Sequence, residues 1–188
     1  RQLGDGALMA ALTRSRGGRM RDIVATIQAE QDEIIRNPHT GVLVVQGGPG
    51  TGKTTTVVTL AALLAEAGQR VVVVDLDGQA NATRWLGVDP RTLAHTVGDV
   101  LLDECSAVEA LVETNTQGVH LLPSNSSVNG DALELRDAVG REMRVKTAIR
   151  DLSDVDVVLI DCPGTIGLMT VIALVAADAA LTVAQPSM

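Results

Sequence analysis

The stretch from Gly47 to Thr54 carries the residue types that hold phosphate groups. It reads Gly-Gly-Pro-Gly-Thr-Gly-Lys-Thr and fits the pattern G-x-x-x-x-G-K-[ST], whose last three positions are Gly52, Lys53 and Thr54. Glycines let successive backbone N–H groups turn toward one anion. A lysine supplies positive charge for the β- and γ-phosphates, and a threonine hydroxyl is a ligand that Mg²⁺ accepts. The stretch therefore predicts a phosphate-binding loop.

Every residue of this loop is an expected contact for the phosphates of a nucleotide: Gly47, Gly48, Pro49, Gly50, Thr51, Gly52, Lys53 and Thr54. Thr54 is also an expected Mg²⁺ ligand. The chain holds only two lysines, Lys53 and Lys146, so a lysine inside this pattern stands out. The alternative is a glycine-rich turn that contains a lysine by chance.

Acidic residues follow two all-apolar runs of the type found in buried strands. Asp161 closes one run, and Asp75 and Asp77 follow the other. Because the carboxyl ends of parallel strands meet at one edge of a sheet, we expect these acids to face the phosphate loop, with the Gly164 N–H near a γ-phosphate. Asp161 is the expected acid on the metal side, and Asp75 and Asp77 divide between supporting the metal and orienting a water molecule. The alternatives are a helix-capping acid and a pair of solvated turn residues.

Strand and helix patterns alternate along the chain from residue 42 onward. Continuous β-branched runs are typical of parallel strands that are buried on both faces. We expect an α/β fold with a doubly wound, mainly parallel sheet of the P-loop NTPase type in residues 41–188, and an N-terminal helical extension, partly flexible, in residues 1–40. The expected strands are 42–46, 71–74, 119–122, 155–160 and 179–184, and the expected helices are 22–36, 54–67, 96–103, 108–113, 131–152 and 166–176.

The composition argues against several classes of protein. The 188 residues carry a net charge of −8, so DNA binding is expected to be weak or absent, with a basic cluster at 14–21 as the one segment to test. Phe and Tyr are absent, so the core is aliphatic. Two cysteines, Cys105 and Cys162, fit a reducing compartment. No stretch is apolar for long enough to span a bilayer, so we expect a cytoplasmic protein without a membrane partner.

Residues 52–188 resemble the ParA/Soj family of chromosome- and plasmid-partitioning ATPases. The resemblance rests on separate blocks, which are Gly52-Lys-Thr-Thr-Thr56, Leu60-Ala-Ala-Leu-Leu-Ala-Glu-Ala-Gly68, Val71-Val-Val-Val-Asp-Leu-Asp-Gly-Gln-Ala-Asn-Ala-Thr83, Leu121-Leu-Pro-Ser-Asn125 and Val158-Leu-Ile-Asp-Cys-Pro163. It implies ATP hydrolysis with ATP and Mg²⁺ as cofactors. It also implies a homodimer that sandwiches the nucleotide and a ParB-like partner that stimulates turnover.

The same resemblance implies a role for each matching residue. Lys53 would bind phosphate, Thr54 would bind Mg²⁺ and Thr55 would contact the α-phosphate. Asp77 would position the hydrolytic water, and Asp161 would be the acid of the Walker B strand. The expected catalytic residues are therefore Lys53, Asp77 and Asp161, and the expected metal ligands are Thr54, Asp75 and Asp161.

Residues 20–54 resemble the start of a UvrD/HelD-type DNA helicase instead. Ile27-Gln-Ala-Glu-Gln31 matches the Q motif of that family, which implies that Gln31 reads adenine. The two resemblances meet at Gly52-Lys53-Thr54, a tripeptide that both families share. We interpret the chain as a fusion of the two at this common sequence.

Several positions depart from the ParA/Soj pattern. The first lysine of that family's loop, which reaches toward the partner's nucleotide, corresponds to Gly48 here. Gly78, Ala80 and Gly164 stand where the family has a proline, a glycine and a proline. The match stops at Met188, before the family's base-binding and DNA-binding segments, so we expect a C-terminally truncated domain. Two alternatives to slow ATP hydrolysis stay open: a nucleotide-binding switch without hydrolysis, and a helicase-derived ATP-binding fragment.

Overall fold

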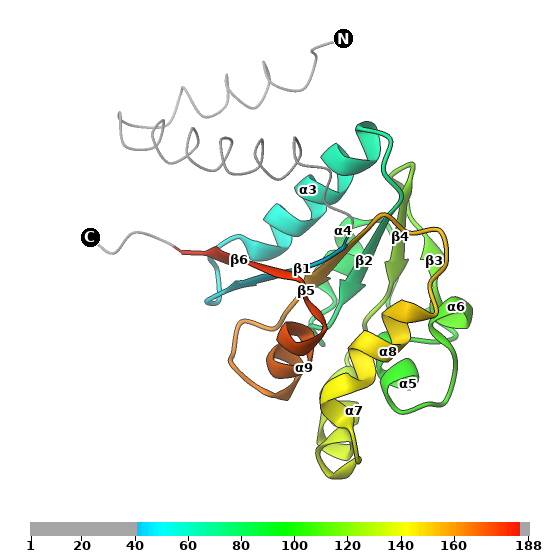
Figure 1. Ribbon diagram of the computed structural model, residues 1–188, viewed down its shortest axis with the longest axis vertical. Coiled ribbons are helices and arrows are strands. Elements are labelled where there is room, and N and C mark those ends of the chain that lie inside the picture. The colour runs from blue at the N-terminus through cyan, green and yellow to red at the C-terminus, as the bar shows by residue number, and fades with distance from the viewer. Residues whose placement is uncertain (1–40, 185–188) are drawn as a thin grey trace. The chain divides into compact units, whose positions relative to one another are not determined.

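A computed structural model describes residues 41–184, and six strands in this part of the chain form one sheet (Figure 1). The strands are β1 (Gly41–Gly47), β2 (Val71–Asp75), β3 (Val112–Glu113), β4 (Val119–Leu122), β5 (Val157–Asp161) and β6 (Ala179–Val183). Their order across the sheet is β3-β4-β2-β5-β1-β6, and all neighbours are parallel except the β3–β4 pair. The expected doubly wound, mainly parallel sheet is confirmed. The expected extension over residues 1–40 lies outside the described residues.

Helices cover both faces of the sheet (Figure 1). On one face α3 (Lys53–Glu66) contacts β1, β2 and β5. On the other face α8 (Arg144–Arg150) and α9 (Leu168–Ala176) share a core with shorter helices. The remaining helical segments are α4 (Asn81–Trp85), α5 (Val97–Leu101), α6 (Ala107–Ala110), α7 (Val128–Glu134) and two 3₁₀ turns, η1 (Leu135–Asp137) and η2 (Arg141–Met143). No helix within residues 41–184 is both long and apolar enough to cross a bilayer.

The two central strands β2 and β5 are buried along their whole length. Successive side chains of a strand point to opposite faces, so Val72 and Val158 join the core under α5, α8 and α9. Their neighbours Val73 and Leu159 are equally buried but lie outside that cluster, on the opposite face. Burial on both faces explains why these strands are continuously apolar until each ends at a carboxylate.

Two of the expected elements are wrong. The single helix expected over 131–152 is divided into α7, η1, η2 and α8, because Ala138 is extended (ψ 134°) and Gly140 has a φ of +71°. The segment expected to be helical over 108–113 contains α6 and then strand β3, in which Val112 pairs with Leu121. Residues 112–113 form a strand because they pair with β4, a contact that the local sequence pattern does not contain. Helix α4 lies in a segment for which no helix was expected.

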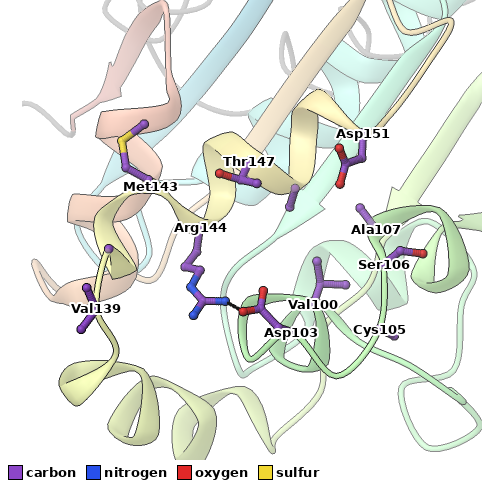
Figure 2. A pocket seen from close by; sticks show the side chains of 12 residues that line it. Val100, Asp103, Cys105, Ser106, Ala107, Val139, Met143, Arg144, Thr147 and Asp151 are labelled. Carbon is purple, nitrogen blue, oxygen red and sulfur yellow. Dashed lines mark ion pairs between the residues drawn. The ribbon is translucent and has the colours of Figure 1, made fainter.

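A pocket of about 310 Å³ lies between the α5–α6 segment on one side and η2 and α8 on the other (Figure 2). Val100 and Ala107 line one side, and Thr147 lines the other. Arg144 reaches across from α8 and forms an ion pair with Asp103, just beyond α5. None of the lining residues belongs to the expected phosphate loop or its acids, so this pocket is separate from the site described below.

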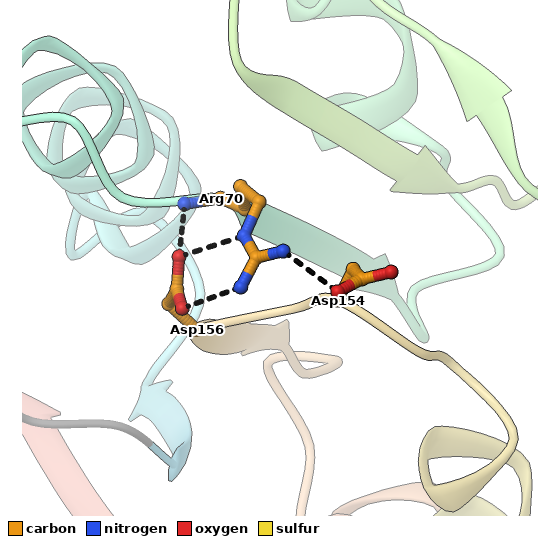
Figure 3. A network of polar contacts seen from close by, with 3 residues as sticks. All are labelled: Arg70, Asp154 and Asp156. Carbon is orange, nitrogen blue, oxygen red and sulfur yellow. Dashed lines mark hydrogen bonds and ion pairs between the residues drawn. The ribbon is translucent and has the colours of Figure 1, made fainter.

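The strands β2 and β5 are joined at their amino ends by a network around Arg70 (Figure 3). Its backbone N–H and its Nε donate to Asp156 Oδ2 at 2.8 and 3.1 Å, and its Nη2 donates to Asp156 Oδ1 at 3.0 Å. Its Nη1 contacts Asp154 Oδ1 at 3.0 Å. The bonds from Arg70 hold the pKa of Asp156 at about 2.

Replacing Asp156 is expected to destabilise the fold more than replacing Asp154. Asp156→Asn removes the charge of a carboxylate that accepts three hydrogen bonds from Arg70. Asp154→Asn affects one contact with Arg70, made by a side chain that is 84% exposed. Urea unfolding followed by circular dichroism at neutral pH measures both variants. Equal unfolding midpoints for the two variants would contradict the expectation.

The effect of Asp156 also depends on pH. Because its pKa is lowered in the folded protein, its stabilising contribution is present above about pH 4 and is lost as the pH falls toward 2. The difference in stability between the wild type and Asp156→Asn should therefore shrink over that range.

Candidate active site

The phosphate loop expected from the sequence connects the end of β1 to the start of α3. Gly52 has a φ of +88°, a conformation that residues with a side chain rarely adopt. A Cβ atom on Gly47 would lie 2.6 Å from the carbonyl oxygen of Val183 in β6, so only glycine fits where the loop leaves the sheet. The N–H and hydroxyl of Thr51 both donate to the Gly48 carbonyl oxygen, at 3.3 and 2.8 Å. The loop is therefore a closed turn directed from the sheet into a helix.

Lys53 is a buried cation that forms no direct ion pair in the described part of the chain, although its charge acts on nearby Asp161. It is the first residue of α3, it is only 8% exposed, and no ion pair within residues 41–184 includes it. A buried charge is costly unless an opposite charge accompanies it. The start of a 14-residue helix also favours negative charge through its dipole. Both features fit an anionic ligand at this position.

Asp161 lies next to the first turn of α3, as expected. Its Oδ2 accepts a hydrogen bond from the Thr54 hydroxyl at 2.8 Å, whereas its Oδ1 is buried and accepts no hydrogen bond in the described part of the chain. Burial, followed by the nearby Asp75 carboxylate, raises the pKa of Asp161 to about 7, against the opposing effects of Thr54 and Lys53. A buried carboxylate oxygen without a partner fits a cation ligand.

Asp75 is the direct neighbour of Asp161 across the β2–β5 pair, and both are fully buried. Asp75 Oδ2 accepts hydrogen bonds from the N–H and the hydroxyl of Thr83, at 2.9 and 2.8 Å. Its Oδ1 accepts the Asp77 N–H at 3.1 Å. Burial raises the pKa of Asp75 to about 6, and these hydrogen bonds oppose the shift. Both oxygens of Asp75 are thus engaged inside the protein.

Asp77 lies two residues after Asp75 in a partly buried turn. Its Oδ1 accepts the Gln79 N–H at 2.9 Å, and its backbone carbonyl accepts the Ser124 hydroxyl at 2.9 Å and the Ala80 N–H at 2.8 Å. In the described part of the chain, the Asp77 side chain accepts its hydrogen bond through Oδ1, so Oδ2 is available to a ligand or water.

Sequence reasoning missed the two residues that hold these acids in place, Thr83 and Ser124. Both are fully buried, and the Ser124 N–H donates to the Thr83 hydroxyl oxygen at 3.0 Å. Each lies inside a block that resembles ParA/Soj, but neither fits a local motif. Their neighbours in sequence are themselves polar, with Asn81 and Arg84 near Thr83 and Asn125 after Ser124, so only their place in these blocks marks them.

The segment after Asp161 contacts the phosphate loop. A Cβ atom on Gly164 would lie 3.1 to 3.3 Å from atoms of Pro49, so the two backbones approach closely. Cys162 is fully buried, and burial followed by the Asp161 charge raises the pKa of its thiol to about 12, so it stays protonated. The expected adenine reader Gln31 lies outside the described residues.

A metal ion at this site would need ligands from outside the protein. Within residues 41–184, no three His, Cys, Asp or Glu side chains are arranged to hold one. Mg²⁺ in nucleotide sites commonly takes one or two protein oxygens and completes its shell with phosphate oxygens and water. The Thr54 hydroxyl and the unpartnered Asp161 Oδ1 fit that requirement.

The relatives of this chain include chromosome partitioning proteins. The profile of the AAA domain family matches residues 42–188. The sporulation initiation inhibitor protein Soj of Bacillus subtilis is 36% identical over 137 residues, which cover 72% of this chain and 54% of Soj. The chromosome partitioning protein ParA of Myxococcus xanthus is 38% identical over 133 residues, which cover 70% of this chain and 47% of that protein. The chain thus spans about half the length of these relatives.

Solved structures agree with this assignment. Cobyrinic acid a,c-diamide synthase from Mycobacterium smegmatis, with bound ATP analog and magnesium, is 41% identical with a TM-score of 0.75, over 77% of this chain and 60% of that chain. The septum site-determining protein MinD from Pyrococcus horikoshii, complexed with Mg-ADP, is 30% identical with a TM-score of 0.65, over 78% of this chain and 58% of that chain. The chain therefore belongs to the AAA domain family, and residues 42–188 are a P-loop ATPase segment of the ParA/Soj type.

Proposed function

We propose that this chain binds ATP together with Mg²⁺ at the loop 47–54 and hydrolyses the nucleotide slowly. The observation that carries the proposal is the grouping of Lys53, Thr54 and Asp161. Lys53 is a buried cation without a direct ion pair in the described residues, and Asp161 has one oxygen on Thr54 and the other unpartnered there. Structures of related proteins with an ATP analog or Mg-ADP support the same ligand.

Each residue of the site has a role in this proposal. The loop N–H groups and Lys53 bind the phosphates, Thr55 contacts the α-phosphate, and Thr54 and Asp161 hold the metal. Mg²⁺, when bound, neutralises charge on the phosphate oxygens. Asp77 orients the attacking water through Oδ2. Asp75 supports the metal side as the neighbour of Asp161 across the β2–β5 pair. Its two oxygens already accept hydrogen bonds, and its direct ligation of the metal stays a prediction.

The second candidate is a nucleotide-binding switch without significant hydrolysis. Its supporting observation is Gly48, an exposed residue at the position where the ParA/Soj pattern has its first lysine. Phosphate release no faster than from ATP in buffer alone, with tight nucleotide binding retained, would select this candidate.

We also propose a nucleotide-sandwiched homodimer, a ParB-like activating partner, and a division of the chain into residues 1–40 and 41–188. The similarity of the chain to the Soj and ParA relatives supports the first two. Sedimentation velocity with and without Mg·ATP tests the dimer.

The fusion with a helicase-like entry segment is also a proposal, supported by the resemblance of residues 20–54. If Gln31 reads adenine, Gln31→Ala should reduce the preference for ATP over GTP by about five- to tenfold, since one lost hydrogen bond costs roughly 1 to 1.5 kcal/mol. Competition binding measures the preference, with Gln28→Ala as the control from the same segment. An unchanged preference in Gln31→Ala would count against the fusion.

Lys53→Ala should weaken Mg·ATP binding by about 10- to 100-fold, because a charged hydrogen bond to phosphate contributes roughly 1.5 to 3 kcal/mol. Isothermal titration calorimetry measures the affinity. Lys146→Ala is the matched control, since it removes the only other lysine of the chain and lies in α8. Equal affinity in the wild type and Lys53→Ala would end the proposal.

Asp161→Asn should stabilise the protein in the absence of nucleotide. Because the pKa of Asp161 is raised to about 7, its ionisation opposes folding, and the penalty is absent below about pH 4 and complete above about pH 7. Above neutral pH the variant is expected to gain about 1 to 3 kcal/mol in the free energy of unfolding. The gain should disappear near pH 4.

The same variant should lose most of the extra stability that Mg·ATP confers on the wild type, because a ligand stabilises only the state that binds it. Urea unfolding with and without Mg·ATP measures both effects, with the exposed Asp151→Asn as the control. A variant that is less stable than the wild type without nucleotide would contradict this reading of Asp161.

A further inference from the structure

We propose that Thr83 and Ser124 form a positioning relay, a chain of hydrogen bonds that holds the water-orienting Asp77 in place relative to the phosphate loop. This inference rests on the proposed function. In the described part of the chain, neither residue forms a hydrogen bond with the phosphate loop. They act on the site only through Asp75 and Asp77.

The relay begins at Thr83 in α4. Its hydroxyl donates to Asp75 Oδ2 at 2.8 Å and accepts the Ser124 N–H at 3.0 Å, and its own N–H donates to the same carboxylate oxygen at 2.9 Å. All three residues are fully buried. A buried hydroxyl that donates to a carboxylate and accepts from an amide has its orientation determined by both partners. Thr83 therefore fixes the carboxylate plane of Asp75.

The relay then reaches Asp77 from two directions. Asp75 Oδ1 accepts the Asp77 N–H at 3.1 Å, and the Ser124 hydroxyl donates to the Asp77 carbonyl oxygen at 2.9 Å. The peptide groups on both sides of the Asp77 Cα are thus anchored, one through β2 and the other through the residues after β4. The Asp77 side chain is itself held at Oδ1 by the Gln79 N–H, which leaves Oδ2 unengaged in the described residues.

The arrangement separates positioning from nucleotide affinity. The groups proposed to contact phosphate and metal directly, apart from Asp75, belong to α3, its loop and β5, whereas the relay connects β2, α4 and the end of β4. Asp75 is the one residue shared by the two, because it is the neighbour of Asp161 across the β2–β5 pair. Loss of the Thr83 hydroxyl should thus release Asp77 and slow hydrolysis, while Mg·ATP still binds.

Thr83→Val removes the hydroxyl and keeps the shape of the side chain. The expected result is a fall in kcat of at least about tenfold with a Kd for Mg·ATP within about threefold of wild type, since the lost hydrogen bond to a charged group is worth roughly 1.5 kcal/mol or more. Thr83→Ser, which retains the hydroxyl, should restore kcat to within about threefold. Ser124→Ala, a milder change, should lower kcat in the same direction.

Thr114→Val is the matched control, because the Thr114 hydroxyl also both donates and accepts, with Val119 O at 2.8 Å and Thr116 N at 3.1 Å, at the amino end of β4. It should lose stability and keep kcat. A Thr83→Val enzyme with unchanged kcat, a Thr83→Ser enzyme as slow as Thr83→Val, or a Kd that rises in parallel with the loss of kcat would each overturn the relay.

Hydrogen exchange of the Asp77 amide in the nucleotide-free protein tests the relay independently of hydrolysis. Exchange should accelerate by about tenfold or more in Thr83→Val and stay unchanged in Thr83→Ser and Thr114→Val. Unchanged exchange in Thr83→Val would reject the relay even if the wild type hydrolyses no ATP. Absence of Mg·ATP binding by the wild type would reject the proposed function alone.

Discussion

The burial of two carboxylates side by side at one sheet edge is the constraint on which the rest of the site depends. Asp75 and Asp161 face each other across the β2–β5 pair and are both fully buried. Like charges at this separation oppose each other's ionisation, and desolvation adds to the penalty. The surrounding hydroxyls, the Asp77 N–H and the Lys53 charge offset part of it. The unequal partners of the two acids divide their roles: Asp75 is saturated by the protein, and Asp161 keeps one oxygen for a ligand.

Local patterns were sufficient to predict the elements that carry the main site. The apolar runs that become β2 and β5 are unambiguous because strands buried on both faces need apolar residues at every position. The loop between Gly47 and Thr54 is equally clear, because its glycines and lysine have a local geometric reason. The carboxyl-edge rule then predicted that the acids would face the phosphate loop, and Asp161 accepts a hydrogen bond at 2.8 Å from Thr54, the last residue of that loop.

What the sequence could not supply depends on contacts between distant residues. Strand β3 forms because Val112 pairs with Leu121. A strand of two residues is too short to show an alternation of apolar and polar residues, so the sequence could not predict this pairing. The interruption of the helix near Gly140 was not predicted, because the charged residues on both sides of it fit a helical pattern. Thr83 and Ser124 were missed for the same reason: their hydrogen bonds cross 8 and 41 residues of sequence, respectively.

One departure from the ParA/Soj pattern, Ala80, lies in the turn that follows the acids Asp75 and Asp77. Ala80 has a φ of +51° and is fully buried, although a left-handed conformation costs a residue with a Cβ roughly 1 kcal/mol or more. Its N–H donates to the Asp77 carbonyl at 2.8 Å, and its carbonyl accepts the Arg84 N–H at 3.1 Å, so the turn keeps this conformation against that cost. The hydrogen bonds that order Asp77 therefore also stabilise the strained start of α4. Because the same few contacts serve both purposes, the geometry of the acids and the fold of the segment from Asp75 to Thr83 cannot vary independently.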